Sequence, residues 1–354
     1  MQIFKWMGYV MPFIFVGSLA ASMPLSPDQL ESYIEKKLRR NNQSLKLNEK
    51  LIGDEGAERL AALPLLKSIT TLKIYKGGVG DAGVRAIAQS ENLRGLKELY
   101  IENNQVTDRG ARYLAESKIL TQLEVLNLYH NRIGDEGAKA LAESDTLKNI
   151  LELNLNYNFI GDEGVQVLTH SKKLNRLSRL QLAYNKLGKA GNLAWQKFRF
   201  RHKIQLWSQT GALEDLGNSY IGDLGLLTLL ESPYIDGIQE WDLSHNNLSD
   251  EAIIALAQSS KLKNLTSLKL AGNHITDRGA VALAQSKMLR GLKHLDLNYN
   301  VIGNDGALAL AETQTLTQLE SLRLGQNRIG SEGAQALSES AALKNLIYPI
   351  FGFY

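Results

Sequence analysis

The sequence repeats itself with a period of 27 residues. One unit reads LNLYHNRIGDEGAKALAES, and counting in steps of 27 from its Asn131, with one longer step after Asn185, reaches an asparagine in most of the other units. A fixed period of this length is typical of a solenoid, because each unit can bury its apolar face only against its neighbours. The period therefore predicts one continuous stack of about 11 units. The repeated asparagines are Asn104, Asn131, Asn158, Asn185, Asn246, Asn273, Asn300 and Asn327.

Each unit predicts a strand followed by a helix. Leu126 and Leu128 alternate with polar neighbours, which indicates a strand with one buried face. Ala138, Leu141 and Ala142 then follow at helical spacing. Because a helix separates strands that run in the same sense, the strands are expected to be parallel. The repeated asparagine after each strand is expected to bond to turn backbone, which would form a structural ladder along the stack.

Helix starts are marked by a short acidic or polar side chain. Asp135 stands where a helix N-cap is expected, with Glu136 following in the first turn. We therefore expect each residue in this slot to cap the helix that it begins. The equivalent residues are Asp54, Asp81, Asp108, Asp162, Asp223, Asp250, Asp277, Asn304 and Ser331.

These residues resemble the leucine-rich repeat family in its helix-containing, ribonuclease-inhibitor-like class. The segments GAKALAES, GAVALAQS and GALALAET resemble the GALA-type bacterial repeats, and the resemblance covers residues 45–354. It implies an α/β horseshoe with parallel strands on the concave face and helices on the convex face. It also implies that the concave face binds another protein. Unlike the vertebrate inhibitor the chain has no cysteine, and residues 23–44 contain no F-box of the kind that precedes GALA-type repeats.

The first residues differ from the repeats. Lys5 precedes an apolar run from Trp6 to Ala20 that ends in small residues, a pattern that resembles a secretory signal peptide over residues 1–22. The run is short for a helix crossing a bilayer core of about 30 Å. We expect export to the periplasm or the medium after cleavage, with a retained membrane anchor as the alternative.

Residues 23–44 predict a helix that caps the first repeat. Ser26-Pro27-Asp28-Gln29 is a capping-box pattern with proline at the first helical position, and an apolar stripe of Leu30, Tyr33, Ile34 and Leu38 follows it. At the other end, register places Leu346, Phe351 and Tyr354 in a last strand. The aromatic segment 348–354 could contact a membrane or a second copy, or result from a shortened gene.

One unit breaks the pattern. The step from Asn185 to Ser219 is 34 residues, so an insertion lies within residues 186–218, and Glu214 stands in a slot that is usually leucine. Aromatic and basic residues alternate there, and aromatics with arginine are common at the centres of interfaces. The alternative is a drifted repeat whose aromatics fill the space of missing leucines. The candidate binding residues of the insertion are Trp195, Phe198, Arg199, Arg201 and Trp207.

The concave face supplies a second candidate site. Tyrosine offers a large contact area at a small entropic cost, and asparagine and glutamine add hydrogen bonds. A tyrosine- and asparagine-lined trough therefore suits protein recognition, although a merely solvated sheet face would also be polar. The candidate residues of the trough are Tyr100, Tyr129, His130, Asn154, Tyr157, Gln181 and Tyr184.

Composition argues against several other functions. Basic and acidic residues number 40 and 37, so no nucleic-acid partner is expected. The absence of cysteine excludes disulfides and thiolate metal sites, and the six histidines have no metal-ligand spacing. No nucleotide-binding or metalloprotease motif is present, so we expect no cofactor, no metal and no catalytic residues.

The sequence thus favours a non-catalytic protein–protein interaction module, exported by a bacterium and acting as an effector or another secreted binding protein. A regulator of a GTPase or other enzyme is one alternative, for which Arg199 or Arg201 would reach the active site. A membrane-anchored scaffold, held by the N-terminal segment or the C-terminal aromatic tail, is the other.

Overall fold

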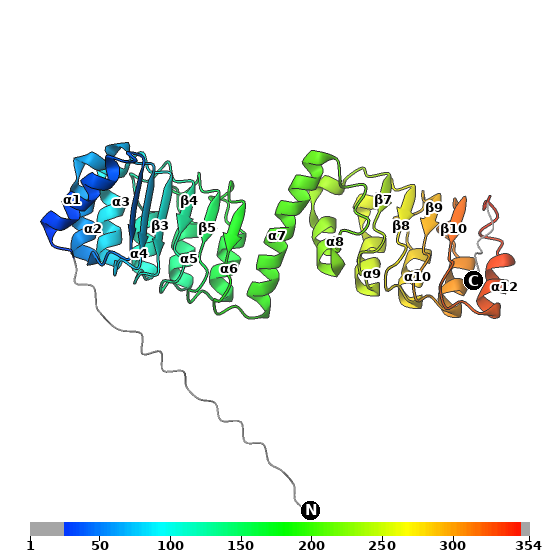
Figure 1. Ribbon diagram of the computed structural model, residues 1–354. Helices are drawn as coiled ribbons and strands as arrows, with labels where there is room; N and C mark the ends of the chain where they lie inside the picture. Colours follow the sequence, from blue (N-terminus) through cyan, green and yellow to red (C-terminus); the bar gives the residue numbers. More distant parts are fainter. Residues whose placement is uncertain (1–24, 348–354) are drawn as a thin grey trace, which may run out of the picture. The chain divides into compact units, whose positions relative to one another are not determined.

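Strands and helices alternate along residues 25–347, the part of the chain that the computed structural model describes (Figure 1). The α-helices are α1 (Pro27–Leu38), α2 (Gly53–Ala62), α3 (Asp81–Gln89), α4 (Asp108–Ala115), α5 (Asp135–Ala142), α6 (Asp162–Thr169), α7 (Lys189–Thr210), α8 (Gly222–Glu231), α9 (Asp250–Gln258), α10 (Asp277–Ala284), α11 (Asn304–Ala311) and α12 (Ser331–Ser338). The strands are β1 (Ser44–Asn48), β2 (Thr71–Tyr75), β3 (Glu98–Glu102), β4 (Val125–Asn127), β5 (Glu152–Asn154), β6 (Arg179–Gln181), β7 (Glu240–Asp242), β8 (Ser267–Lys269), β9 (His294–Asp296) and β10 (Ser321–Arg323). Short 3-10 helices are η1 (Pro64–Ser68), η2 (Glu91–Leu93), η3 (Pro233–Ile235) and η4 (Ser260–Leu262).

Two predictions concern residues outside this range. The signal peptide at residues 1–22 and the C-terminal aromatic segment at residues 348–354, with Phe351 and Tyr354, lie outside the described residues. Leu346 lies inside the range and is half-buried against the core. Among residues 25–347, no helix has the length and the apolar character needed to cross a bilayer.

All strand pairs are parallel, as predicted. One sheet has the order β1 to β6 and the other has the order β7 to β10. Paired residues lie one repeat apart, so that Leu99 pairs with Leu126 and Leu126 pairs with Leu153. The alternating apolar residues of each repeat face inward, and Leu126 in β4 and Leu128 just after it are both fully buried. Within each group of repeats the helices cover one face of the strands (Figure 1), which confirms the predicted α/β repeat solenoid.

The repeats form two compact units, one ending at Gly188 and the other beginning at Lys189. This differs from the single continuous stack that the period predicts. The break follows from the insertion, where α7 has 22 residues and the helices of the other repeats have 8 to 10. The strand expected near Glu214 is reduced to one bridge between Asp215 and Asp242, and Glu214 is exposed where other repeats bury a large apolar residue.

The repeated asparagines bond to backbone in two neighbouring repeats. Asn185 and Asn327 are half-buried, and the other six are buried. Asn131 Oδ1 accepts from Val106 N at 3.0 Å, and Asn131 Nδ2 donates to Ile101 O at 2.7 Å and to Leu128 O at 3.1 Å. Asn158 repeats this pattern one unit later. Each side chain thus satisfies backbone groups that the turn leaves without partners.

The helix-capping prediction is wrong in one respect. Asp135 is the first residue of α5, and its carboxylate caps the following helix α6: Oδ1 accepts from Gly161 N at 2.6 Å and from Gly164 N at 3.0 Å. Gly164 lacks a side chain because an added Cβ would lie 2.6 Å from that oxygen. The same pair of contacts to the next helix is made by Asp54, Asp81, Asp108, Asp250, Asp277 and Asn304.

Helix α1 covers the first repeat as a capping helix would. Both capping-box bonds form, from Gln29 N to Ser26 Oγ at 3.4 Å and from Ser26 N to Gln29 Oε1 at 3.0 Å. Leu30 and Ile34 are buried, and α1 contacts β1 and α2. The helix therefore hides an apolar edge that the first repeat would otherwise expose.

Candidate functional site

The strand face of the first unit arranges its side chains in columns that run across the repeats. The register pairs Val125 with Glu152 and Glu152 with Arg179, and it likewise pairs Asn127 with Asn154 and Asn154 with Gln181. Neighbouring strands lie about 4.8 Å apart, so side chains within one column are in contact range. Two further columns follow where the strands end, just before the buried asparagine.

The last of these columns has an unusual backbone conformation. The residue before each repeated asparagine position in the first unit has φ between 51° and 58°, in the left-handed region. This region favours glycine and tolerates asparagine, and other residues adopt it at a cost of about 1–2 kcal/mol. Nevertheless this column includes two tyrosines. Its members are Glu49, Lys76, Asn103, His130, Tyr157 and Tyr184.

Three tyrosines form a continuous group, here called the tyrosine stack: Tyr129, Tyr157 and Tyr184. The Tyr157 and Tyr184 rings are stacked, with centroids 4.2 Å apart and an interplanar angle of 16°, and Tyr129 meets Tyr157 edge-on at 5.1 Å. His130 lies 6.0 Å from both Tyr129 and Tyr157. Tyr184 keeps 72% of its surface exposed and Tyr157 keeps 37%. The structure thus brings together four of the seven residues predicted for the trough.

Tyr100 belongs to a separate, acidic part of the same face. Its hydroxyl donates to Glu98 Oε2 at 3.3 Å, and the Lys73 ammonium lies 3.6 Å from its ring centroid. Partial burial, followed by the nearby negative charge of Glu98, raises the pKa of Tyr100 above its ordinary value. Weaker contributions come from Glu152 and Glu102.

Asn154 and Gln181 are partly engaged within the sheet. Asn154 Oδ1 accepts from Asn156 N at 3.0 Å, a local turn contact, and Gln181 Oε1 accepts from Asn156 Nδ2 at 3.2 Å. Both side chains are half-buried. They hold the strand ends in shape, and only their remaining donors and acceptors are available to a partner.

The sequence prediction missed two exposed residues that lie close in sequence to the tyrosine stack. Phe159 is 51% exposed, and the Lys186 ammonium lies 4.8 Å from its ring centroid. Both residues directly follow a repeated asparagine, so counting by 27 one position further would have placed them in one column, here called the rim. The acidic residues Glu98, Glu102 and Glu152 were also missed, although strand alternation puts them on the exposed face.

The insertion residues lie on α7, in the second unit. Trp207 is half-buried and packs with Phe200 against the core of that unit. This packing fits the alternative prediction, in which aromatic residues of the insertion fill the space of missing leucines. The Arg199 guanidinium lies 5.8 Å from the Trp195 ring. Phe198 stacks with His202, with ring centroids 6.3 Å apart, and Arg201 is exposed.

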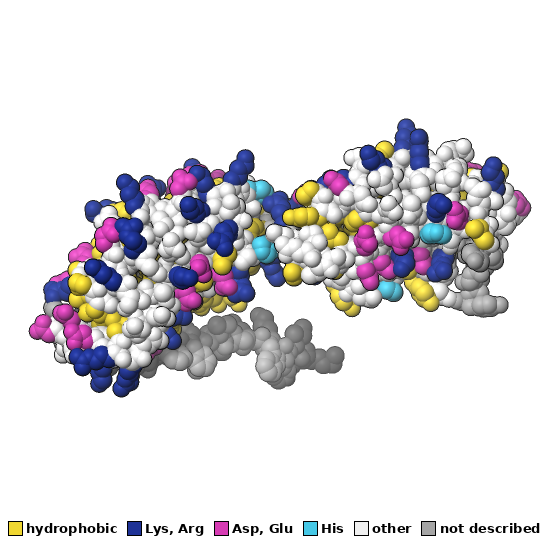
Figure 2. Space-filling model, turned by 90° about the horizontal axis from the view of Figure 1, so that it is seen from above, with side chains coloured by type: hydrophobic (Ala, Val, Ile, Leu, Met, Phe, Trp, Pro, Cys, Tyr) yellow, Lys and Arg dark blue, Asp and Glu magenta, His cyan; other side chains and the backbone are white. Residues whose placement is uncertain are grey.

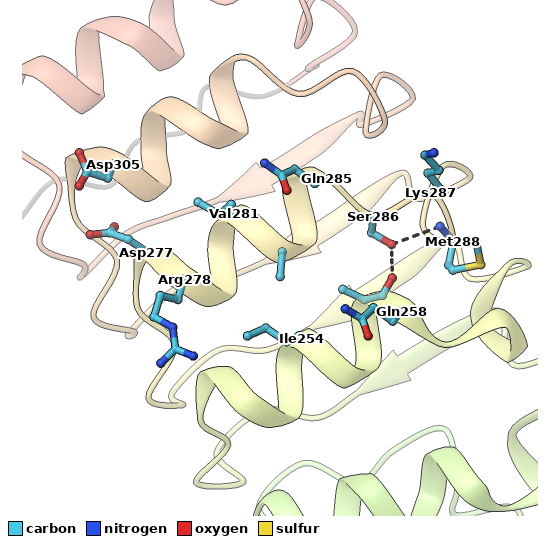
Figure 3. A pocket seen from close by; sticks show the side chains of 12 residues that line it. Ile254, Gln258, Asp277, Arg278, Val281, Gln285, Ser286, Lys287, Met288 and Asp305 are labelled. Carbon is cyan, nitrogen blue, oxygen red and sulfur yellow. Dashed lines mark hydrogen bonds between the residues drawn. The ribbon is translucent and has the colours of Figure 1, made fainter.

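The helix face carries shallow grooves between consecutive helices. The one formed by α9, α10 and α11 has a volume of about 740 Å³, with Ile254 and Val281 between the helices and Arg278, Asp277 and Asp305 near one end (Figure 3). Similar grooves lie between α3 and α4, between α4 and α5, and between α11 and α12. Because the groove recurs with the repeat, it reflects the small alanines between helices rather than a particular ligand.

Charges of both signs are interspersed over the face of each unit that Figure 2 shows. Opposite charges on neighbouring strands form ion pairs, such as Arg179 with Glu152 at 2.7 Å and Lys269 with Asp242 at 3.2 Å. Among the described residues, no group of three or more His, Cys, Asp or Glu side chains is arranged to hold a metal ion.

Comparison with known proteins bears on the repeats. The family model described as "Leucine Rich repeat" matches seven segments, at residues 93–115, 120–142, 146–168, 238–257, 261–284, 291–311 and 315–338. No curated protein matches the chain. A solved structure described as "Crystal structure of a TDR receptor" is 16% identical, with a TM-score of 0.31. The alignment covers 84% of this chain and 50% of the receptor chain, so this chain spans about half the length of that receptor.

Proposed function

The chain belongs to the leucine-rich repeat family, whose domains generally mediate protein–protein interaction, and from this premise we propose that the strand face of its first unit binds a partner protein. The site is the tyrosine stack with His130 and the rim residues Phe159 and Lys186. Its side chains suit binding, because they offer a large contact area and hydrogen bonds.

One observation carries the proposal: two exposed tyrosines in left-handed backbone positions stack on each other, with ring centroids 4.2 Å apart, whereas Tyr299 in the equivalent position has no ring partner among the described residues. Tyr157 and Tyr184 have φ of 55° and 58°, and the equivalent position holds Asn103 in an earlier repeat. Folding alone would be served better by asparagine or glycine there. Strain of this kind is concentrated at functional sites, and tyrosine is among the residues most enriched at interface centres.

The stack also has the form of a preorganised binding surface. Each ring is held by its neighbour, so little side-chain entropy is lost when a partner covers them. The exposed parts of Tyr184 and Phe159 supply apolar area at the edge, and the Asn154 and Gln181 amides supply hydrogen bonds inside the trough.

A displayed library of random peptides tests the proposal without knowledge of the natural partner. We expect the immobilised protein to retain peptides that a Tyr157→Asn, Tyr184→Asn double variant no longer retains, with affinities reduced by about tenfold or more. Asparagine preserves the left-handed backbone, so the fold should be unaffected, which thermal unfolding would check.

Tyr299→Asn is the matched control. Tyr299 occupies the same position of a repeat in the second unit, with φ of 56° and 61% of its surface exposed. It should retain the same peptides as the unaltered protein. The proposal is contradicted if the double variant retains the same peptides, or if only Arg199→Ser with Arg201→Ser abolishes binding.

We further propose that the protein is exported and acts outside the cytoplasm of a bacterium. The leader-like pattern of residues 1–22 supports this, since a basic residue, a short apolar run and a small-residue exit form a signal for secretion. N-terminal sequencing of the mature protein should find a start near Met23. A mature chain that still begins at Met1 and fractionates with membranes would support an anchored scaffold instead.

A further inference from the structure

Strand β3 presents two carboxylates on the face that carries the tyrosine stack. Glu98 and Glu102 alternate with the buried Leu99 and Ile101, and Tyr100 lies between them. Both glutamates are half-buried, and within residues 25–347 neither takes part in an ion pair. Their contacts are neutral: Glu98 accepts from Thr71 and Tyr100, and Glu102 accepts from Asn127 Nδ2 at 2.7 Å.

These carboxylates lie next to the aromatic group. Glu102 precedes Tyr129 by one repeat, so the two residues occupy the same column on adjacent strands, about 4.8 Å apart along the backbone. Glu152 is in the column of Glu98, two strands away, and it already pairs with Arg179. Burial raises the pKa of Tyr100 most, and the negative charges of Glu98, Glu152 and Glu102 raise it further.

Cations already meet aromatic rings on this surface. The Lys73 ammonium lies 3.6 Å from the Tyr100 ring centroid, and Lys186 lies over Phe159 at 4.8 Å. The negative face of an aromatic ring attracts a positive charge, and more strongly where water is excluded. The tyrosine stack itself has no such cation on it among the described residues.

We infer that the polypeptide segment seated on the tyrosine stack carries arginine or lysine side chains, whose cations pair with Glu98 and Glu102 while their stems pack on the rings of Tyr129 and Tyr157. This inference rests on the proposed function and adds the chemistry of the partner. Neither half-buried carboxylate forms an ion pair within residues 25–347, and a basic segment would supply one where an acidic or neutral segment would not.

The attraction between the two glutamates and a basic segment becomes stronger when the partner covers the trough. When the segment excludes water from the trough, the effective dielectric constant falls and an unpaired carboxylate becomes costly. A basic segment compensates for that cost, and an acidic segment would add repulsion, so the two glutamates select between partners. Arginine suits this site particularly well, because one planar guanidinium can stack on a tyrosine ring and at the same time donate hydrogen bonds to a carboxylate.

The peptide library described above also tests this inference. Among the peptides whose retention requires Tyr157 and Tyr184, we expect arginine and lysine to be enriched over the starting library. For synthetic copies of these peptides, Glu98→Gln with Glu102→Gln should weaken binding by about tenfold or more, and added salt should weaken binding to the unaltered protein.

A matched control removes the same charge elsewhere. Glu136 and Glu163 are exposed on helices α5 and α6 of the same unit, so Glu136→Gln with Glu163→Gln changes the net charge equally without altering the trough. This variant should bind the peptides with unchanged affinity. Thermal unfolding of both double variants should match the unaltered protein, which would exclude misfolding as the cause.

Two results would overturn the inference in different ways. If no peptide depends on the tyrosine stack, the proposed function fails and the inference fails with it. If peptides depend on the stack but show no excess of basic residues, or bind the Glu98→Gln, Glu102→Gln variant as tightly as before, the function stands and the basic partner is wrong.

Discussion

At the scale of single residues, the position before each repeated asparagine has a left-handed backbone, and the residues that this conformation favours differ from some of the residues found there. The same backbone angle recurs at Asn103, His130 and Tyr157, so the position is set by the repeat and not by its side chain. The conformation costs a tyrosine more than an asparagine, because the tyrosine Cβ crowds the backbone and asparagine adopts this region readily. The backbone conformation therefore does not explain why tyrosine occupies this position.

Replacing Tyr299 by asparagine should stabilise the protein. Tyr299 has φ of 56° and is 61% exposed, and among the described residues it has no ring partner, so the substitution relieves strain and forfeits little packing. We expect the free energy of unfolding to rise by about 1 kcal/mol, measured by urea denaturation. Tyr184→Asn should gain less, because it also loses the stacked Tyr157 ring, worth about 0.5–1.5 kcal/mol. A destabilised Tyr299→Asn variant would show that the left-handed tyrosine is not strained.

The tyrosine stack could be predicted from sequence only in part. Counting by 27 places His130, Tyr157 and Tyr184 in one column, and that arithmetic is enough to expect contact. It gives no backbone angle, so the strain that supports function could not be foreseen. Tyr100 shares the strand face but points to its own acidic neighbours, since a column position fixes the strand and not the direction of a long side chain.

At the scale of elements, the acidic residue at each helix start joins successive repeats. Asp135 belongs to α5, yet its carboxylate accepts hydrogen bonds at the start of α6. This one side chain caps α6, and its negative charge interacts favourably with the positive end of the α6 dipole. Asn304 makes the same contacts through its amide oxygen, at 2.8 Å to Gly330 N and 3.2 Å to Gly333 N. The contact therefore needs an acceptor oxygen and gains further from its charge.

Asp135→Ala should loosen the following helix and leave its own helix intact. The amides of Gly161 and Gly164 lose their acceptor, so their hydrogen exchange should accelerate, and the amides of α5 should exchange as before. We expect a loss of about 1–2 kcal/mol in the free energy of unfolding, and a smaller loss for Asp135→Asn. If hydrogen exchange became faster in α5 and not in α6, Asp135 would be the cap of its own helix, as the sequence predicts.

The elements themselves were well predicted from sequence. Alternating leucines gave the strands, and the same spacing put Leu126 and Leu128 in the core. The direction of capping was wrong because Asp135 stands both at the start of its own helix and one repeat away from the next helix start, and linear spacing does not distinguish these partners. A helix at Trp195–Trp207 follows from the repeat, but the full length of α7 was not predicted, since its residues lack the alanine and leucine spacing of the other helices.

At the scale of the whole molecule, the insertion divides a nearest-neighbour stack. In a solenoid, each repeat is stabilised by contacts with the adjacent repeats, so cooperativity spreads only as far as those contacts continue. The sheet ends at β6 and a new one begins at β7, and the core of the second unit runs from Ile204 to Leu343. Helix α7 adds Ile204, Phe200 and Trp207 to that core, which is why it belongs to the second unit.

We therefore expect the protein to unfold in two transitions, one for each unit. Leu126→Ala in β4 and Leu268→Ala in β8 remove equivalent, fully buried side chains from different units, and each should cost about 2–5 kcal/mol. In differential scanning calorimetry each variant should lower the midpoint of one transition and leave the other in place. Peptide binding at the tyrosine stack should be lost at the transition that Leu126→Ala shifts, because the whole site lies in the first unit. A single transition that both variants lower equally would mean that stabilising contacts continue through the insertion, and that the chain folds as one stack after all.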